Sequence, residues 1–176
     1  MILKMNNLEQ KDMIELLYRA NDSGVETQLI IRSVCSILTG KPGLSDNIHG
    51  LSILDRFLEH SRIFYFFNNG EEEIFISSAD WMERNLHFRV ETLIPIYDPQ
   101  IKEIFKTLLQ IQLQDNVKAR SLDYGKVNEY KTSDYDLAVR SQVETYYYIK
   151  RMTETFYAKK TEEKKKSRSP KSQSNN

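Results

Sequence analysis

The chain has 176 residues, with 25 Lys or Arg and 25 Asp or Glu, so its formal net charge is zero. This balance conceals an asymmetry, because residues 158–176 contain seven Lys or Arg and two acids, a net charge of +5, which leaves residues 1–157 at −5. An acidic body argues against a nucleic-acid-binding protein, which needs a basic face, and requires any phosphate ligand to bind in a local basic pocket. We expect one domain over residues 1–157 and a disordered basic tail over residues 158–176.

The first half of the chain combines helical and extended patterns. Apolar residues at helical spacing predict an amphipathic helix over residues 11–22. Residues 25–32 are rich in β-branched side chains and predict a strand. The Gly-, Pro- and Asn-rich segment 39–50 predicts a long loop, and residues 52–59 predict a short helix.

The second half continues this alternation. Residues 62–67 and 73–77 predict a hairpin across the Asn-Asn-Gly sequence at 68–70, and residues 90–96 predict another strand. Asp98 followed by Pro99 predicts the start of a helix. A last helix is predicted from Ser133, which forms a capping-box-like pair with Asp136. Helices interleaved with strands predict an α/β fold with a mixed β-sheet flanked by helices.

His60 is the first candidate for chemistry, because Arg62 follows it by two residues on a predicted strand and both side chains therefore point to the same side. An imidazole, with a reference pKa of about 6.5, exchanges protons near neutral pH, and a guanidinium binds phosphate oxygens. A lone histidine is most often structural. Here the neighbouring Glu59, Ser61 and Arg62 favour a functional histidine, since charges on an apolar strand need partners.

Other candidate phosphate ligands lie where predicted strands end. Arg32 ends a strand, the position at which α/β proteins commonly bind ligands; the alternative is an ordinary surface arginine. Ser78 and Asp80 lie in a small-residue turn that either binds a ligand or simply caps the strand. Lys4 and Asn6, near the start of the chain, could contact an anionic chain.

Several blocks of sequence, in order, resemble one family. They are Lys4-Met-Asn-Asn-Leu, Met13-Ile-Glu-Leu-Leu-Tyr18, Leu29-Ile-Ile-Arg32-Ser-Val-Cys35, Pro42-Gly-Leu-Ser45-Asp-Asn47, Ser52-Ile-Leu-Asp-Arg56-Phe-Leu-Glu-His60-Ser-Arg62, Ser77-Ser-Ala-Asp80-Trp-Met82, Pro95 and Asp115-Asn-Val-Lys-Ala-Arg120. This pattern resembles the C-terminal part of bacterial polyphosphate kinases, which have a phospholipase D-like fold with two lobes facing one active site. The resemblance implies a phospholipase D-like lobe that is incomplete at its start, so the chain is expected to be a fragment or a truncated product.

The resemblance also implies an activity and residue roles. The family reversibly transfers the terminal phosphate of ATP to inorganic polyphosphate through a phosphohistidine, which is expected on the preceding lobe. His60 corresponds to the histidine of the second lobe, Arg32 to a nucleotide-phosphate arginine, and Arg62 to the usual lysine of the phospholipase D pattern. Two departures are a serine at position 33, where the family usually has glycine, and Phe67, where the wider superfamily has an acid.

Expected partners follow from the same resemblance. They are ATP or ADP, polyphosphate and the preceding lobes of the enzyme, with Mg²⁺ and a homo-oligomer in the full-length protein. The sequence has no Cys/His cluster that predicts a metal site in this chain, no apolar run long enough to cross a membrane, and one cysteine, Cys35, which fits a reducing, cytoplasmic compartment. Two alternatives remain: a phospholipase D-like phosphodiesterase acting as a dimer, and a non-catalytic module that binds polyphosphate or nucleotide.

Overall fold

The computed structural model describes residues 1–132 and 137–168, with side chains described as far as residue 161. The chain divides into two compact units, Met1–Gln142 and a second unit from Val143 onward. The first unit contains the whole β-sheet, and the second consists, among the described residues, of most of helix α4 (Ser141–Arg168). Within the described residues, no helix has both the length and the apolar composition that a membrane span requires.

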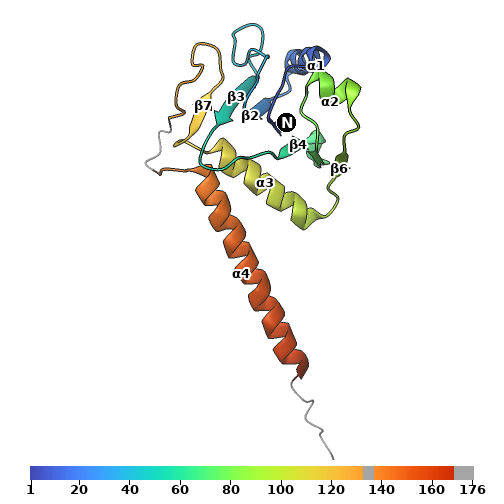
Figure 1. Cartoon of the computed structure of the whole chain (residues 1–176), viewed down its shortest axis with the longest axis vertical. Coiled ribbons are helices and arrows are strands. Elements are labelled where there is room, and N and C mark those ends of the chain that lie inside the picture. The colour runs from blue at the N-terminus through green and yellow to red at the C-terminus, as the bar shows by residue number, and fades with distance from the viewer. Residues whose placement is uncertain (133–136, 169–176) are drawn as a thin grey trace, which may run out of the picture. The chain divides into compact units, whose positions relative to one another are not determined.

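A seven-stranded mixed sheet forms the centre of the first unit (Figure 1). Its strands, in the spatial order β6-β5-β4-β1-β2-β3-β7, are β6 (Leu93–Pro95), β5 (Glu73–Ser77), β4 (Arg62–Phe66), β1 (Ile2–Met5), β2 (Thr27–Ile31), β3 (Ile48–Ile53) and β7 (Ala119–Ser121). The pairs β1–β2 and β2–β3 are parallel, and all other neighbours are antiparallel. The predicted α/β class with a mixed sheet is confirmed.

One end of this sheet collects the candidate residues, and we call it the carboxyl edge because β1, β2 and β3 end there. The antiparallel strands β4 and β7 begin at the same edge, since Ile63 pairs with Lys4 and Ala119 pairs with Ile53. Strand β5 ends there, because Ser77 pairs with Arg62. The carboxyl ends of parallel strands are the usual ligand-binding edge of an open α/β sheet.

Two apolar clusters cover the two faces of the sheet. On the α1 face, Leu17 of α1 (Lys11–Asp22) packs with the buried strand residues Leu3 and Leu29. On the α3 face, Leu109 of α3 (Pro99–Leu113) packs with strand residues such as Ile63. The two helices therefore hold the sheet between them.

The predicted bounds of α1 and the predicted start of α3 are confirmed. Helix α1 spans the predicted residues, and Gln10 caps it by accepting a hydrogen bond from the backbone N–H of Met13 at 2.8 Å. Asp98 caps α3 by accepting from the backbone N–H groups of Gln100 and Ile101 at 2.8 and 3.0 Å. Pro99 occupies the first turn, where its missing N–H removes no helical bond.

The predicted helix over residues 52–59 is wrong. Residues 48–53 form strand β3, and residues 54–61 form no helix or strand. The predicted loop was also too long, because it included Gly50, which lies inside β3. A Cβ at Gly50 would lie 3.1 Å from the Cβ of Leu122 and 3.3 Å from the side chain of Thr39. Glycine therefore marks a close approach of neighbouring segments here rather than a turn.

The predicted hairpin is confirmed, with β4 and β5 joined through a short 3₁₀ turn at Asn68–Gly70. Asn68 and Asn69 have φ of 45° and 52°, a left-handed conformation that asparagine tolerates better than most residues. The helix α2 (Glu83–Phe88) follows β5, and the predicted strand over residues 90–96 is shortened to β6.

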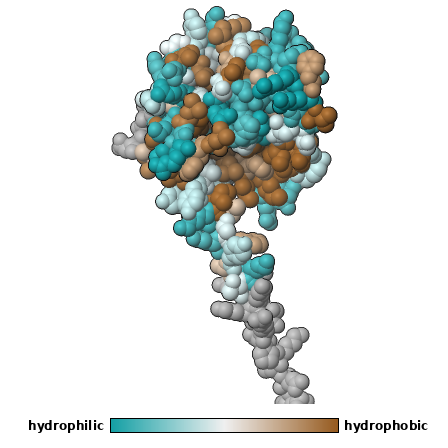
Figure 2. Space-filling model, viewed as in Figure 1, coloured by the Kyte–Doolittle hydropathy of each residue, from teal (hydrophilic) through white to brown (hydrophobic). Residues whose placement is uncertain are grey.

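Figure 2 shows that apolar and hydrophilic residues are intermixed on the viewed face of the molecule. Several large apolar side chains of the described residues are exposed to solvent.

The second unit differs from the prediction. Helix α4 begins at Ser141, and the predicted start at Ser133 with its partner Asp136 lies outside the described residues. Residues 158–168 belong to this helix, whereas their Lys-rich composition predicted a disordered tail from residue 158. A run of Lys and Glu is compatible with a helix because both residues have high intrinsic helix propensity.

Candidate functional site

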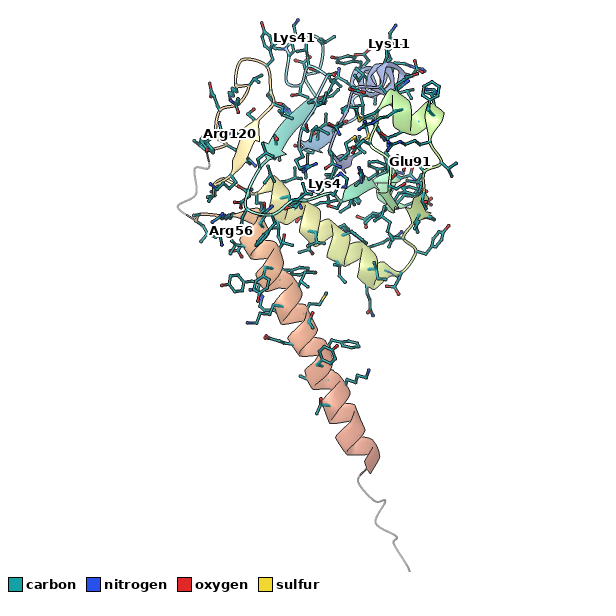
Figure 3. The ribbon with its side chains drawn as sticks, in the orientation of Figure 1. Lys4, Lys11, Lys41, Arg56, Glu91 and Arg120 are labelled. Carbon is teal, nitrogen blue, oxygen red and sulfur yellow. The ribbon has the colours of Figure 1, made fainter. Side chains whose placement is uncertain are left out.

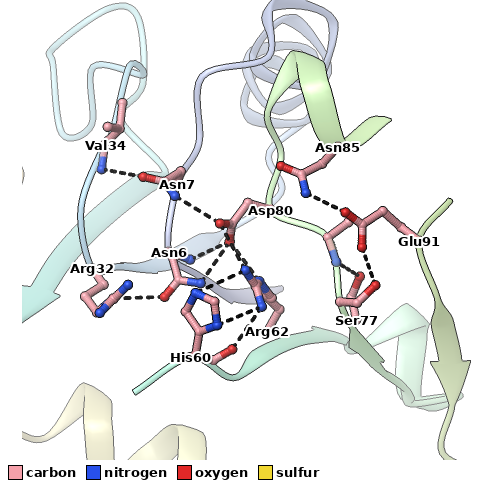
Figure 4. Close-up of polar contacts among 12 residues, drawn as sticks. Asn6, Asn7, Arg32, Val34, His60, Arg62, Ser77, Asp80, Asn85 and Glu91 are labelled. Atoms are coloured by element: carbon pink, nitrogen blue, oxygen red, sulfur yellow. Dashed lines mark hydrogen bonds and ion pairs between the residues drawn. The ribbon is translucent and has the colours of Figure 1, made fainter. Parts of the chain in front are cut away.

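Arg62 and Asp80 form a buried ion pair at the carboxyl edge (Figure 4). Nε of Arg62 donates to Oδ1 of Asp80 at 3.0 Å, and Nη2 donates to Oδ2 at 3.2 Å. The side chains are 12% and 5% exposed. This two-point geometry fixes the orientation of the guanidinium plane, as a bidentate arginine–carboxylate pair does.

Two consecutive asparagines complete the set of donors around Asp80. Oδ1 also accepts from the backbone N–H of Asn6 at 2.8 Å and from its side-chain amide at 3.2 Å, while Oδ2 accepts from the amide of Asn7 at 2.9 Å. Burial by itself raises the pKa of Asp80, but the donors from Arg62, Asn6 and Asn7 outweigh it and lower the pKa to about 2. Asp80 is therefore a carboxylate at neutral pH. We call Asn6, Asn7, Arg62 and Asp80 the Asp80 cluster.

Arg32 joins this cluster through Asn6. Its Nε donates to Oδ1 of Asn6 at 2.9 Å, and Asn6 in turn donates to Asp80. Arg32 follows directly after β2, as the sequence predicted for a residue at the end of a strand. Ser33, for which the resemblance suggested a glycine, is not among the described residues with positive φ, so serine follows Arg32 without backbone strain.

His60 lies at the exposed side of the cluster. Its imidazole is solvent-exposed, and Nη1 of Arg62 donates to its backbone carbonyl at 3.2 Å. The ring nitrogens Nδ1 and Nε2 each lie 3.4 Å from a nitrogen of the same guanidinium. These separations exceed ordinary N–H hydrogen-bond lengths, so the guanidinium lies alongside the ring rather than bonding to one nitrogen. The predicted proximity of His60 and Arg62 is confirmed, but the predicted place of His60 on the strand is wrong, because β4 begins at Arg62.

A second charged group approaches the same segment from the other face of the sheet. Nζ of Lys4 donates to Oε2 of Glu59 at 2.9 Å, and the amide of Gln112 in α3 donates to the same oxygen at 3.1 Å. Lys4 pairs in register with Ile63, so its side chain lies on the α3 face, and the residue is only 6% exposed. We call Lys4, Glu59 and Gln112 the Lys4 cluster. It anchors the residue immediately before His60.

Ser78 is bonded within the chain on the β6 side of the Asp80 cluster. Its hydroxyl donates to Glu91 and accepts from the backbone N–H of Thr92 at 2.9 Å. Hydrogen bonds from Ser78 and Asn85 lower the pKa of Glu91. Of the predicted site residues, Asn6, Arg32, His60, Arg62 and Asp80 are thus linked by direct contacts, whereas Lys4 and Ser78 have bonds of their own elsewhere.

Sequence reasoning did not predict Asn7, Glu59 or Glu91 as site residues. Asn7 bonds Asp80 through its amide, and its Oδ1 accepts from the backbone N–H of Val34 at 3.2 Å. The pair Asn6-Asn7 directly after a strand was the available signal, because asparagine side chains readily bond to nearby backbone groups. Trp81, which follows Asp80, is 8% exposed and packs against Phe64 with ring centroids 5.5 Å apart.

The residues present do not fit a magnesium site. The described part of the chain holds no group of three or more His, Cys, Asp or Glu side chains suited to a metal ion. Both oxygens of Asp80 are occupied by nitrogen donors, which leaves them unavailable as Mg²⁺ ligands.

Comparisons with known proteins give a consistent result. Residues 1–142 match the family model described as polyphosphate kinase C-terminal domain 2. The polyphosphate kinase of Vibrio cholerae is 47% identical over 148 residues, which cover 84% of this chain and 21% of that protein. The polyphosphate kinase of Escherichia coli K12 is 42% identical over 148 residues, which cover 84% of this chain and 22% of that protein.

A solved structure supports the same relation. The crystal structure of the polyphosphate kinase from Porphyromonas gingivalis superposes with a TM-score of 0.83 at 46% sequence identity, covering 88% of this chain and 24% of that one. The match confirms the predicted phospholipase D-like fold. The chain spans about a fifth of the length of the curated relatives it matches.

Proposed function

The chain belongs to the polyphosphate kinase family, and from this premise we propose that it supplies the phosphate clamp and the second histidine of an ATP:polyphosphate phosphotransferase. The observation that carries the proposal is an exposed imidazole, His60, lying 3.4 Å from the guanidinium of Arg62, whose plane is fixed by a buried carboxylate. Arg32 reaches the same cluster through Asn6. A proton carrier and two guanidinium groups at the carboxyl edge suit a reaction in which phosphate charge builds up.

Each residue has a distinct role in this proposal. Arg32 and Arg62 bind phosphate oxygens with charge-assisted hydrogen bonds. Asp80 does not bind phosphate, although the sequence pointed to it as a ligand, because a carboxylate repels phosphate oxygens. It instead orients Arg62 and neutralises part of its charge. Asn6 orients Arg32, so the buried cluster prepares both arginines before the substrate arrives.

The proposed transfer has two halves. A histidine nitrogen of the preceding lobe bonds to the terminal phosphorus of ATP as the bond to the bridging oxygen breaks, and the electron pair stays on the leaving ADP oxygen. His60 gives its proton to that oxygen and becomes neutral. In the second half, a terminal polyphosphate oxygen attacks the phosphohistidine phosphorus, the N–P bond breaks, and His60 recovers a proton from the incoming phosphate. The site is reversible because the same groups act in both directions.

A chimaera tests this function, because the isolated chain lacks the proposed phosphohistidine and is expected to show no turnover. Replacing the matching 148 residues of the Vibrio cholerae enzyme with this chain is expected to give ATP-dependent polyphosphate synthesis. His60→Ala in the chimaera should lower the rate by about 10²- to 10⁴-fold, the usual contribution of general acid–base help. The readout is polyphosphate formed from labelled ATP.

His49→Ala is the matched control, since His49 is a half-exposed histidine of β3 that pairs with Asp123 instead of the Asp80 cluster. It should leave the rate unchanged. A His60→Ala chimaera as active as the unsubstituted one would contradict the proposal. Turnover by the isolated chain would place the nucleophile in this lobe, and polyphosphate binding without any turnover in the chimaera would favour a binding module.

A further inference from the structure

A cavity of about 490 Å³ opens at the carboxyl edge where β2, β3 and β7 meet. Arg32 and Arg120 both line it, and its lining includes Ser33, Ser52 and Asn128 but no Asp or Glu. Residues 1–157 carry a net charge of −5. A cavity lined by two arginines and no acid is therefore a locally basic site in an acidic domain, which a phosphate ligand requires. Apolar side chains such as Leu54 complete the lining and weaken the screening of charge by water.

Arg120 is held in a fixed orientation beside this cavity. It lies in β7, opposite Ser52 of β3, and Figure 3 places it at the far side of the sheet from Glu91. Its guanidinium carbon lies 3.9 Å from the centroid of the Tyr130 ring, and its Nη1 donates to the backbone carbonyl of Asn128 at 2.8 Å. Stacking on an aromatic ring orients a guanidinium without using its donors.

The backbone around Arg120 is equally well fixed. Oδ1 of the fully buried Asp115 accepts from the N–H groups of Val117, Lys118 and Ala119 at 2.7 to 3.0 Å. Its Oδ2 accepts from the N–H of Ser141 at 2.7 Å. This turn sets the start of β7, so the position of Arg120 is determined before any ligand binds.

Donors remain available on both arginines. Among the guanidinium nitrogens, the hydrogen bonds of the described residues use only Nη1 of Arg120 and only Nε of Arg32. Each guanidinium has five N–H donors in a planar fork. The free donors therefore carry positive charge toward a cavity that offers no carboxylate to receive it.

We propose that Arg32 and Arg120 form a second phosphate subsite, which binds one phosphate of a linear phosphate chain whose neighbouring phosphate lies at His60. The ligand class rests on the function proposed above, but the role of Arg120 goes beyond it. Arg32 lies between the two subsites, because it contacts the Asp80 cluster through Nε and lines the cavity. The protein therefore binds its ligand at two successive phosphates.

Inorganic tripolyphosphate is the probe for this subsite, and the full 176-residue chain is the protein. Titration followed by NMR of the arginine Nε–Hε signals should shift those of Arg32, Arg62 and Arg120 with one common saturation curve. Shifts at Arg32 and Arg62 with none at Arg120 would overturn the second subsite and leave the proposed function standing. A shift at Arg120 without one at Arg62 would support the subsite and count against the clamp at His60, and no shift at any arginine would overturn both.

Variants supply the second measurement. Arg120→Gln should weaken tripolyphosphate binding by about 10- to 100-fold, the loss expected for charged hydrogen bonds, and Arg120→Lys should restore part of it. Lys126→Gln removes the same charge from the segment that follows β7 but outside this cavity, and should leave the affinity unchanged. Equal losses in the Arg120→Gln and Lys126→Gln variants would overturn the subsite by showing a general charge effect.

A parallel titration with ATP identifies the source of the phosphate. An Arg120 signal that responds to tripolyphosphate alone assigns the subsite to the polymer, and an equal response to ATP assigns it to the nucleotide's triphosphate. Both outcomes support a phosphate subsite.

Discussion

The Asp80 cluster and the Lys4 cluster secure the segment around His60 from opposite faces of the sheet, but they are built differently. Asp80 receives five hydrogen bonds shared between both of its oxygens. Glu59 receives two, both on Oε2. The Asp80 side chain is 5% exposed, whereas the Glu59 side chain is 26% exposed.

The different burial and hydrogen bonding of Asp80 and Glu59 indicate different structural roles for the two clusters. A buried carboxylate with every lone pair used is costly to disturb, because each lost partner leaves a desolvated charge. Such a group keeps Arg62 in one orientation, which a phosphate clamp requires. Glu59 retains contact with water, and Oε1 of Gln112 is buried without a partner in the described part of the chain. The Lys4 cluster is therefore the looser anchor.

The largest effect is expected from breaking the Asp80 cluster. Arg62→Leu keeps the apolar stem but leaves Asp80 buried without its cation, and it should lower the free energy of unfolding by about 3–5 kcal/mol. Urea denaturation of the isolated chain measures this loss. Arg84→Leu, at an exposed arginine of α2, is the control and should have little effect. A similar small loss for Arg62→Leu would mean that water replaces the missing partner.

Protonation of Asp80 at low pH should remove the stabilising contribution of the Asp80 cluster within a defined pH range. The folded pKa of Asp80 is lowered to about 2, so its contribution to stability is complete above the unfolded pKa of about 3.9 and is lost as the pH falls toward 2. A shift of roughly two units corresponds to about 2–3 kcal/mol. The free energy of unfolding should therefore fall between pH 4 and pH 2, and Asp80→Asn should flatten this dependence.

The control for this prediction is Asp12→Asn, because Asp12 is an exposed aspartate in the first turn of α1. It should leave the acid dependence in place. Asp115 adds to the same acid dependence of stability. Burial raises its pKa, but the hydrogen bonds that it accepts outweigh burial, so its pKa is lowered overall. Asp80→Asn is accordingly expected to remove part of the slope, and an unchanged slope would contradict the assignment.

Local features of the structure could be predicted from the sequence wherever residues close together in the chain determine them. The cap of α3 depends on Asp98 and Pro99 alone, and the proximity of His60 and Arg62 depends on a spacing of two. The helix expected over residues 52–59 failed because Ser52 and Ile53 belong to β3, where they pair with Arg120 and Ala119 of β7 and Ile53 is buried in the core. Tertiary pairing overrides a short local preference.

Which residues form the site could not be predicted from any one segment of sequence, because it depends on contacts between segments. Lys4 and Asn6 are two residues apart, yet Lys4 faces α3 while Asn6 contacts Asp80. The face of Lys4 follows from the pairing of β1 with β4, some 60 residues away in sequence. Asn7 and Arg120 likewise acquire their roles only through partners brought by other strands.

The smallest effect is expected at Lys4, where sequence and structure suggest different roles. Lys4→Met keeps the length of the side chain and leaves Glu59 partly hydrated and still bonded to Gln112, so the stability loss should be about 1 kcal/mol or less. If Lys4 acts only as an anchor, tripolyphosphate affinity will be unchanged while the unfolding curve shifts slightly. If it contacts the phosphate chain, the affinity will fall by far more than the stability, which would require Nζ to leave Glu59 when the ligand binds.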